Sequence, residues 1–156
     1  MSKINRLREL VPDISITTDI IVGFPNETEE QFNETLTLVD EVKYESAFTF
    51  IYSPRRGTPA AKIVDNVSYS EKSRRFKELV KHLEVNIEAD SKRYIGGVYK
   101  VLVDGVSKTD KEMLSGYTES NKLVHFKGDE SFIGKIINVK ILESHTYSLI
   151  GEIVDE

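Results

Sequence analysis

The stretch from Asp19 to Thr28 combines residue types that bind ligands in α/β proteins. It reads Asp-Ile-Ile-Val-Gly-Phe-Pro-Asn-Glu-Thr, so an apolar strand ends at Gly23 and a helix begins after Glu27. Ligands bind such folds at the carboxyl ends of parallel strands, where a glycine and the free amides of a helix start allow close approach. We therefore take this stretch as a candidate binding site. The alternative is an ordinary loop in which Glu27 only offsets the helix dipole.

A second polar stretch runs from Tyr52 to Pro59 and ends the next predicted strand at the same edge of the sheet. In it, Arg55 and Arg56 lie beside hydroxyl side chains and are held in place by neighbouring Pro and Gly residues. Guanidinium groups in this setting grip phosphate or carboxylate groups. The alternative is a stiff, solvated turn.

A third candidate lies in the second half of the chain, between two short predicted strands. Tyr117 has the ring to stack on a base, Asn121 can bond a base edge, and Lys122 can meet a phosphate. Lys108 adds local positive charge. The alternative is a polar hairpin without a ligand, which the acidic balance of this half favours.

Several other kinds of chemistry are excluded. The chain has no cysteine, which rules out a disulfide scaffold, a thiol nucleophile and a cysteine-ligated iron–sulfur cluster. His82, His125 and His145 lack metal-ligand spacing, and we expect no metal site. There is no phosphate-binding loop and no nucleophile elbow. We therefore expect no catalytic residue in this chain.

Composition describes an ordinary globular protein. The chain has 156 residues, of which 39% are hydrophobic and 30% charged, and its net charge is −5. That balance does not by itself indicate nucleic-acid binding. No apolar run approaches the roughly 20 residues that span a bilayer, and we see no leader sequence, so we expect a cytoplasmic protein with no membrane partner.

Two strands and a helix position the first two candidates. Residues 14–24 read as a strand buried on both sides, and 46–52 as a second strand. Between them, Thr28 and Gln31 form a predicted capping box at the start of a helix. This strand–helix–strand unit implies a parallel sheet. The apolar face of the helix comprises Phe32, Leu36, Val39 and Val42.

The pattern changes near residue 93. A long helix is predicted over residues 70–92, and short strands separated by turns follow it. Five such strands favour a small β-barrel of the oligonucleotide-binding kind. The predicted fold is therefore α/β over residues 1–92 followed by all-β over 93–156. The predicted strands are 98–103, 113–117, 122–126, 133–142 and 147–154, with turns at Asp104-Gly105, Gly128-Asp129 and Gly151.

Four stretches carry a family resemblance. Residues 18–32 and 48–61 resemble the late barrel strands and loops of radical S-adenosylmethionine methylthiotransferases, and residues 103–108 and 114–124 resemble the TRAM domain of that family. Within the family, the resemblance is strongest to the tRNA-modifying, MiaB-type enzymes. It implies that residues 1–92 are the tail of a radical-SAM (β/α) barrel and that the later part is an OB-like TRAM barrel.

The resemblance implies a function. Such enzymes cleave S-adenosylmethionine with a 4Fe-4S cluster, hold a second 4Fe-4S cluster, and add a methylthio group at C2 of N6-isopentenyladenosine beside the tRNA anticodon. The cofactor would contact this chain at the end of the two strands, and tRNA would contact it through basic loops and the TRAM barrel. The implied cofactor-binding residues are Asp19, Ile21, Gly23, Phe24, Glu27, Tyr52 and Ser53, and the implied RNA-binding residues are Arg55, Arg56, Lys108, Tyr117, Asn121 and Lys122.

Two departures from the family pattern matter. Without cysteine, the chain resembles a C-terminal fragment that binds no cluster and is inactive without the N-terminal domains of the same protein. Tyr117 and Glu119 stand where relatives commonly carry arginine. A complete (β/α) barrel takes roughly 250 residues, so residues 1–92 make up only part of one. We therefore expect bare apolar surface near residues 14–24, which favours pairing with a second copy. The alternatives are a ribosomal-protein methylthiotransferase and a stand-alone RNA-binding module.

Overall fold

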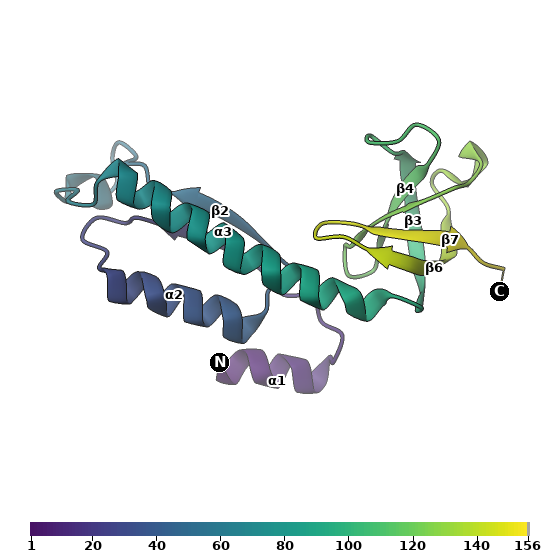
Figure 1. Ribbon diagram of the computed structural model, residues 1–156, viewed down its shortest axis with the longest axis horizontal. Coiled ribbons are helices and arrows are strands. Elements are labelled where there is room, and N and C mark those ends of the chain that lie inside the picture. The colour runs from purple at the N-terminus through teal and green to yellow at the C-terminus, as the bar shows by residue number, and fades with distance from the viewer. Residues whose placement is uncertain (156) are drawn as a thin grey trace. The chain divides into compact units, whose positions relative to one another are not determined.

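Parallel pairing of two short strands organises the first part of the chain (Figure 1). In the computed structural model, which describes residues 1–155, β1 (Thr17–Val22) pairs in parallel with β2 (Ser46–Ile51), and α2 (Glu29–Val42) connects them. The predicted strand–helix–strand unit is therefore confirmed, although β1 is shorter than the predicted 14–24. An additional helix, α1 (Ser2–Leu10), precedes β1 and buries none of its residues.

Helices cover only one face of this two-stranded sheet. Figure 1 shows α2 and α3 (Tyr69–Ser91) side by side over the sheet. The opposite face is bare, because Ile21 is 56% exposed and Phe48 71% exposed. The prediction that β1 is buried on both sides is thus wrong, whereas the expected apolar surface near this strand is confirmed. The core residues of the covered side are Val22, Phe32, Leu36, Val39, Val42, Leu79 and Leu83.

Side-chain hydrogen bonds and ion pairs fix the starts of both helices. The hydroxyl of Thr28 accepts from the Gln31 amide at 3.2 Å, and the Gln31 side chain accepts from the Thr28 amide at 3.0 Å, which confirms the capping box. In the first turn of α3, hydrogen bonds from Arg74, with a second contribution from Arg75, lower the pKa of Glu71 from 4.5 to about 2. These contacts stabilise the two helix ends that lie nearest the carboxyl end of β1.

The second part of the chain is a closed five-stranded barrel with the strand order β3-β4-β5-β7-β6. All neighbouring strands are antiparallel except β5 and β7, which are parallel. Buried apolar side chains fill the inside, with Tyr94 of η2 (Lys92–Tyr94) packed against them. The predicted barrel is confirmed. Its strands are β3 (Val98–Val106), β4 (Leu114–Thr118), β5 (Leu123–Phe126), β6 (Ile136–Ser144) and β7 (Leu149–Ile153), and η3 (Glu130–Phe132) precedes β6.

The first part forms one compact unit, Met1–Asn86, and a second unit begins at Ile87, inside α3. Two predicted turns in the second unit are wrong. Residues Asp104 and Gly105 lie inside β3, where a bulge shifts the register instead of reversing the chain. Gly151 lies inside β7. A glycine is needed there because a Cβ would lie 2.6 Å from the backbone oxygen of Lys140. Glycine in these strands serves close packing and bulging, not turning.

Gly116→Ala should destabilise the barrel by about 1–3 kcal/mol, the usual cost of overpacking. A Cβ at Gly116 would lie 2.4 Å from the Leu102 backbone oxygen, which cannot move without disturbing the β3–β4 ladder. Denaturant unfolding followed by fluorescence measures the change. Gly105→Ala is the matched control, since nothing lies within 4 Å of its added carbon. Equal losses in the two variants would contradict this account of Gly116.

Glu71→Gln should flatten the acid dependence of unfolding. Because the pKa of Glu71 is about 2 in the folded chain and 4.5 ordinarily, its ionised form stabilises the fold above about pH 4.5, and this contribution disappears as the pH falls toward 2. Thermal midpoints followed by circular dichroism between about pH 7 and 2 measure the slope. Glu34→Gln, at an exposed position of α2, should keep the wild-type slope. A wild-type slope in Glu71→Gln would contradict the assignment.

Candidate functional site

A tight turn follows β1 and carries the first candidate residues. Gly23 has φ +72° and Asn26 has φ +67°, both in the left-handed region, so the chain reverses sharply here. The Glu27 amide donates to the Phe24 carbonyl at 2.9 Å, and the Gly23 amide donates to the Glu27 carboxylate at 2.9 Å. The Glu27 side chain therefore folds back to close the turn on itself.

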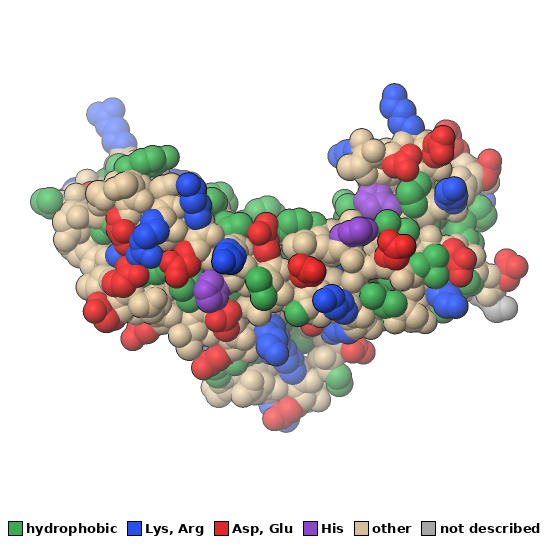
Figure 2. Space-filling view, viewed as in Figure 1, with side chains coloured by type: hydrophobic (Ala, Val, Ile, Leu, Met, Phe, Trp, Pro, Cys, Tyr) green, Lys and Arg blue, Asp and Glu red, His purple; other side chains and the backbone are tan. Residues whose placement is uncertain are grey.

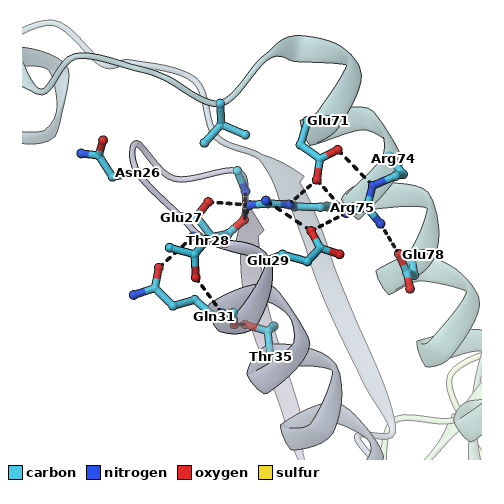
Figure 3. A network of polar contacts seen from close by, with 12 residues as sticks. Asn26, Glu27, Thr28, Glu29, Gln31, Thr35, Glu71, Arg74, Arg75 and Glu78 are labelled. Carbon is cyan, nitrogen blue, oxygen red and sulfur yellow. Dashed lines mark hydrogen bonds and ion pairs between the residues drawn. The ribbon is translucent and has the colours of Figure 1, made fainter.

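Arg75 of α3 fastens this turn (Figure 3). Its Nη1 donates to the Glu27 carboxylate at 2.7 Å and to the Glu27 backbone oxygen at 2.9 Å. Its Nε donates to Glu71 at 2.9 Å. Although burial lowers the pKa of Arg75, the hydrogen bonds that it donates to Glu27 and Glu71 raise this pKa above its ordinary value. Glu27 is thus engaged by two internal donors, Gly23 and Arg75.

Tyr52, at the end of β2, adjoins the same turn. The Tyr52 amide donates to the Val22 carbonyl at 2.8 Å, which continues the parallel pairing one residue beyond β2. Its ring meets Phe24 edge-on, with the centroids 5.1 Å apart, and the Lys72 ammonium lies 5.1 Å from the Tyr52 ring centroid. The Tyr52 hydroxyl is buried and has no hydrogen-bond partner among the described residues. The structure therefore brings together Gly23, Phe24, Glu27 and Tyr52.

The other predicted residues of this unit lie on the bare face of the sheet or in the loop after β2. Asp19 pairs with Phe48 and Ile21 pairs with Phe50 in the two-stranded ladder. Asp19, Ile21, Phe48 and Phe50 alternate with the covered residues, so they belong to the bare face. Ser53, Arg55 and Arg56 are exposed in the loop after β2.

Sequence reasoning missed the cations that hold this site. Lys72 and Arg75 are both about 5% exposed, and Lys72 pairs with Asp65, whose pKa that bond lowers. The Asn66 side chain accepts from the Asn26 amide at 2.9 Å, so the loop before α3 also contacts the turn. A signal was present, because positions 72 and 75 continue the apolar stripe of Leu79 toward the helix start. A cation on that stripe indicates a buried polar partner.

The barrel presents Tyr117 within an exposed apolar row. Leu102 of β3 pairs with Tyr117 on one side and with Ile136 on the other. The three residues are 51%, 40% and 66% exposed in that order. Tyr117 also pairs with Leu123 of β5. An aromatic ring on an open strand face is the arrangement that stacks on unpaired bases.

The remaining candidates of the barrel differ in exposure. Asn121 is exposed at the β4–β5 turn with φ +62°, and Lys108 is exposed in the loop after β3. Lys122, in contrast, is only 6% exposed, with its ammonium 5.7 Å from the Tyr94 ring centroid. Thr118 accepts from the Lys122 amide at 3.0 Å and from the Asn121 amide at 2.9 Å, so this turn is held internally.

Charges of both signs alternate over the surface that α2 and α3 form (Figure 2). Arg74, for example, pairs with Glu29, Glu71 and Glu78. In residues 1–155, no group of three or more histidine, aspartate or glutamate side chains is arranged to hold a metal ion. In the same range, no helix is both long and apolar enough to cross a membrane.

Comparisons with known proteins agree with this architecture. Residues 92–154 match the model of the TRAM domain. The chain is 51% identical over 153 residues to the tRNA-2-methylthio-N(6)-dimethylallyladenosine synthase of Geobacillus kaustophilus, a match that covers 98% of this chain and 29% of that protein. It is 52% identical over 156 residues to the Bacillus subtilis protein of the same name, covering 100% of this chain and 31% of that protein.

A third relative of that name, from Oceanobacillus iheyensis, is 54% identical over 152 residues, which are 97% of this chain and 29% of that protein. The chain thus spans about 30% of the length of these curated relatives. It carries a TRAM domain in its second half and is similar, over nearly its whole length, to tRNA-2-methylthio-N(6)-dimethylallyladenosine synthases.

Proposed function

We propose that this chain is the C-terminal part of a tRNA methylthiotransferase that adds a methylthio group at C2 of N6-isopentenyladenosine next to the anticodon. The observation that carries the proposal is the identity of about 50% over 98% of the chain to enzymes of that name. In this proposal the chain supplies part of the S-adenosylmethionine site and the tRNA-binding module. In the same proposal the enzyme acts in the cytoplasm. The boundary between its radical-SAM domain and its TRAM domain lies between residues 92 and 93.

The sheet of the first unit supports a partial radical-SAM barrel. In a (β/α) barrel, helices cover the outside of the strands and the inner face is filled by the other strands. Here α2 and α3 cover one face, while Ile21, Phe48 and Phe50 leave the other face bare. We propose that the N-terminal domains of the same protein complete the barrel over this face. In the isolated chain, a second copy would cover the same surface as a dimer.

We propose that the cofactor rim, formed by the turn from Gly23 to Glu27 and by Tyr52 at the end of β2, receives the nucleoside of S-adenosylmethionine. The Tyr52 hydroxyl is a buried polar atom without a partner among the described residues. The half-exposed side chains of Ile21 and Phe24 offer the apolar lining that ligand sites use around a few polar groups. In the proposal Asp19, Gly23, Glu27 and Ser53 complete this site, with Glu27 shaping the turn through its bond to the Gly23 amide.

The chemistry of the reaction comes from groups that this chain does not hold. S-Adenosylmethionine, when bound and reduced by a 4Fe-4S cluster, supplies the radical that activates the acceptor carbon. Thiolates hold such clusters, and with no cysteine this chain supplies no such ligand, so both clusters belong to the rest of the enzyme. The residues of this chain orient the cofactor, and the barrel walls exclude water from the reaction.

The TRAM barrel is the proposed tRNA-binding module. Tyr117, exposed between Leu102 and Leu123, would stack on an unpaired base, and Asn121 would bond a base edge. Lys108 would meet phosphates, as would Arg55 and Arg56 of the first unit. Because Lys122 is buried against Tyr94, its contribution would be to hold the β4–β5 turn close to the RNA.

A modification assay tests the function. The complete protein that contains this chain, with its clusters reconstituted, is offered tRNA bearing isopentenyladenosine or a ribosomal-protein substrate, and mass spectrometry locates the product. We expect methylthiolated tRNA and unmodified ribosomal protein. Modification of the ribosomal protein alone would favour that sister enzyme. Sequencing the gene upstream of Met1 tests the third alternative. A native start codon at Met1, with no cysteine-rich segment encoded in frame before it, would favour a stand-alone RNA-binding module.

Tyr117→Ala should weaken tRNA binding roughly 5- to 150-fold, since stacking on one base contributes about 1–3 kcal/mol. Lys108→Ala should lower the slope of log affinity against log salt by about 1, the signature of one phosphate contact. Filter binding at several salt concentrations measures both effects. Tyr69→Ala, which removes an exposed ring from the start of α3, is the control. Equal losses in both tyrosine variants would contradict a specific role for Tyr117.

A further inference from the structure

Arg75 is a buried cation whose bonds converge on three separate segments (Figure 3). It bonds Glu27 of the turn twice, Glu71 of its own helix at 2.9 Å, and Glu29 of α2 at 3.4 Å. Its guanidinium also lies 5.6 Å from the ring centroid of Phe32. These bonds reach four acceptor atoms, which the five donors of a guanidinium can serve and the three donors of a lysine ammonium cannot.

The turn that Arg75 contacts needs external support. It contains two left-handed residues, Gly23 and Asn26, and at Asn26 the presence of a side chain makes this conformation less favourable than it is at a glycine. Backbone of this kind persists only where the surroundings over-determine it. The Glu27 carboxylate supplies that support by accepting from both Gly23 and Arg75 through the same oxygen, Oε2.

Lys72 supports the turn from a second direction. A Cβ on Gly23 would lie 2.4 Å from Cγ of Lys72, so the lysine stem packs directly on the glycine. The same lysine pairs with Asp65 and lies beside the Tyr52 ring. Lys72 therefore links the turn after β1 to Tyr52 at the end of β2, while Arg75, one helical turn further along α3, holds the turn itself.

We propose that Arg75 is a positioning residue for the cofactor rim: through Glu27 it holds the turn from Gly23 to Glu27 in the conformation that receives the S-adenosylmethionine nucleoside. This inference rests on the proposed function and adds to it a residue of α3, outside the strand ends themselves. Without the guanidinium, the turn opens more often, and the apparent affinity falls in proportion to the fraction of molecules that remain competent.

Arg75→Lys tests the role in the complete enzyme, with Arg74→Gln as the matched control. Arg74 shares Glu29 and Glu71 with Arg75, and none of its bonds reaches Glu27. In Arg75→Lys we expect amide hydrogen exchange of the peptide covering the turn to accelerate about tenfold, and KM for S-adenosylmethionine to rise about tenfold at nearly constant kcat. Arg74→Gln should change neither.

Glu27→Gln is a second variant that keeps the side-chain shape and weakens the ionic link. It should loosen the turn in the same direction as Arg75→Lys, and thermal unfolding confirms that each variant is folded. Unchanged exchange in Arg75→Lys, equal acceleration in Arg74→Gln, or faster exchange with an unchanged KM would each overturn the positioning role. If the wild-type enzyme binds no S-adenosylmethionine, it is the proposed function that is overturned.

Discussion

A single hydrogen-bonded link, from the Arg75 guanidinium through the Glu27 carboxylate to the Gly23 amide, joins the helical layer of the first unit to the end of its sheet. The two charged side chains of the link are largely shielded from water, with Arg75 at 6% and Glu27 at 12% side-chain exposure. Removing one partner of such a buried pair leaves an uncompensated charge, which costs far more than losing a surface pair. The geometry of the rim therefore depends on a residue far away in sequence.

The second unit depends on a different constraint, the closure of a very small barrel. Five strands can enclose a core only where the chain comes unusually close to itself, and Gly116 and Gly151 mark two such places. Closure brings β5 and β7 together as the one parallel pair among the described strands of the barrel. Inside, apolar side chains such as Val101, Val139 and Phe126 fill the space, whereas Tyr117 is the exposed position of β4 and lies on the outer face.

Local patterns were sufficient for the order of the main helices and strands from β1 onward, whereas helix α1 was not predicted. The Thr28–Gln31 capping box, the apolar stripe of α3 and the short barrel strands separated by turns are all short-range signals, and the structure reproduces them. The resemblance placed candidates at the strand ends, and Gly23, Phe24, Glu27 and Tyr52 do meet there. Their proximity follows from parallel pairing, which brings the carboxyl ends of adjacent strands to one edge.

Long-range contacts were beyond such reasoning. Gly151 was predicted to be a turn residue. Its actual role is to leave room for the Lys140 backbone, and that role depends on the pairing of β6 with β7, which no local pattern encodes. For the same reason, Lys72 and Arg75 were not singled out, since their partners Asp65 and Glu27 lie in loops. Lys122 was expected at the surface, and its burial against Tyr94 depends on how η2 packs onto the barrel.

The bare side of the two-stranded sheet has a consequence for how cells would treat this polypeptide. Phe48 and Phe50 alternate along β2 with their rings toward solvent, and β1 places Ile21 beside Phe50. An aromatic strip of this kind, flanked by unpaired strand edges, is the surface on which aggregation begins. The closed barrel offers no such edge. A polypeptide that contained only residues 1–156 would expose this aromatic strip permanently. Chaperones and proteases would then recognise the polypeptide through its first unit, while the TRAM domain stayed folded.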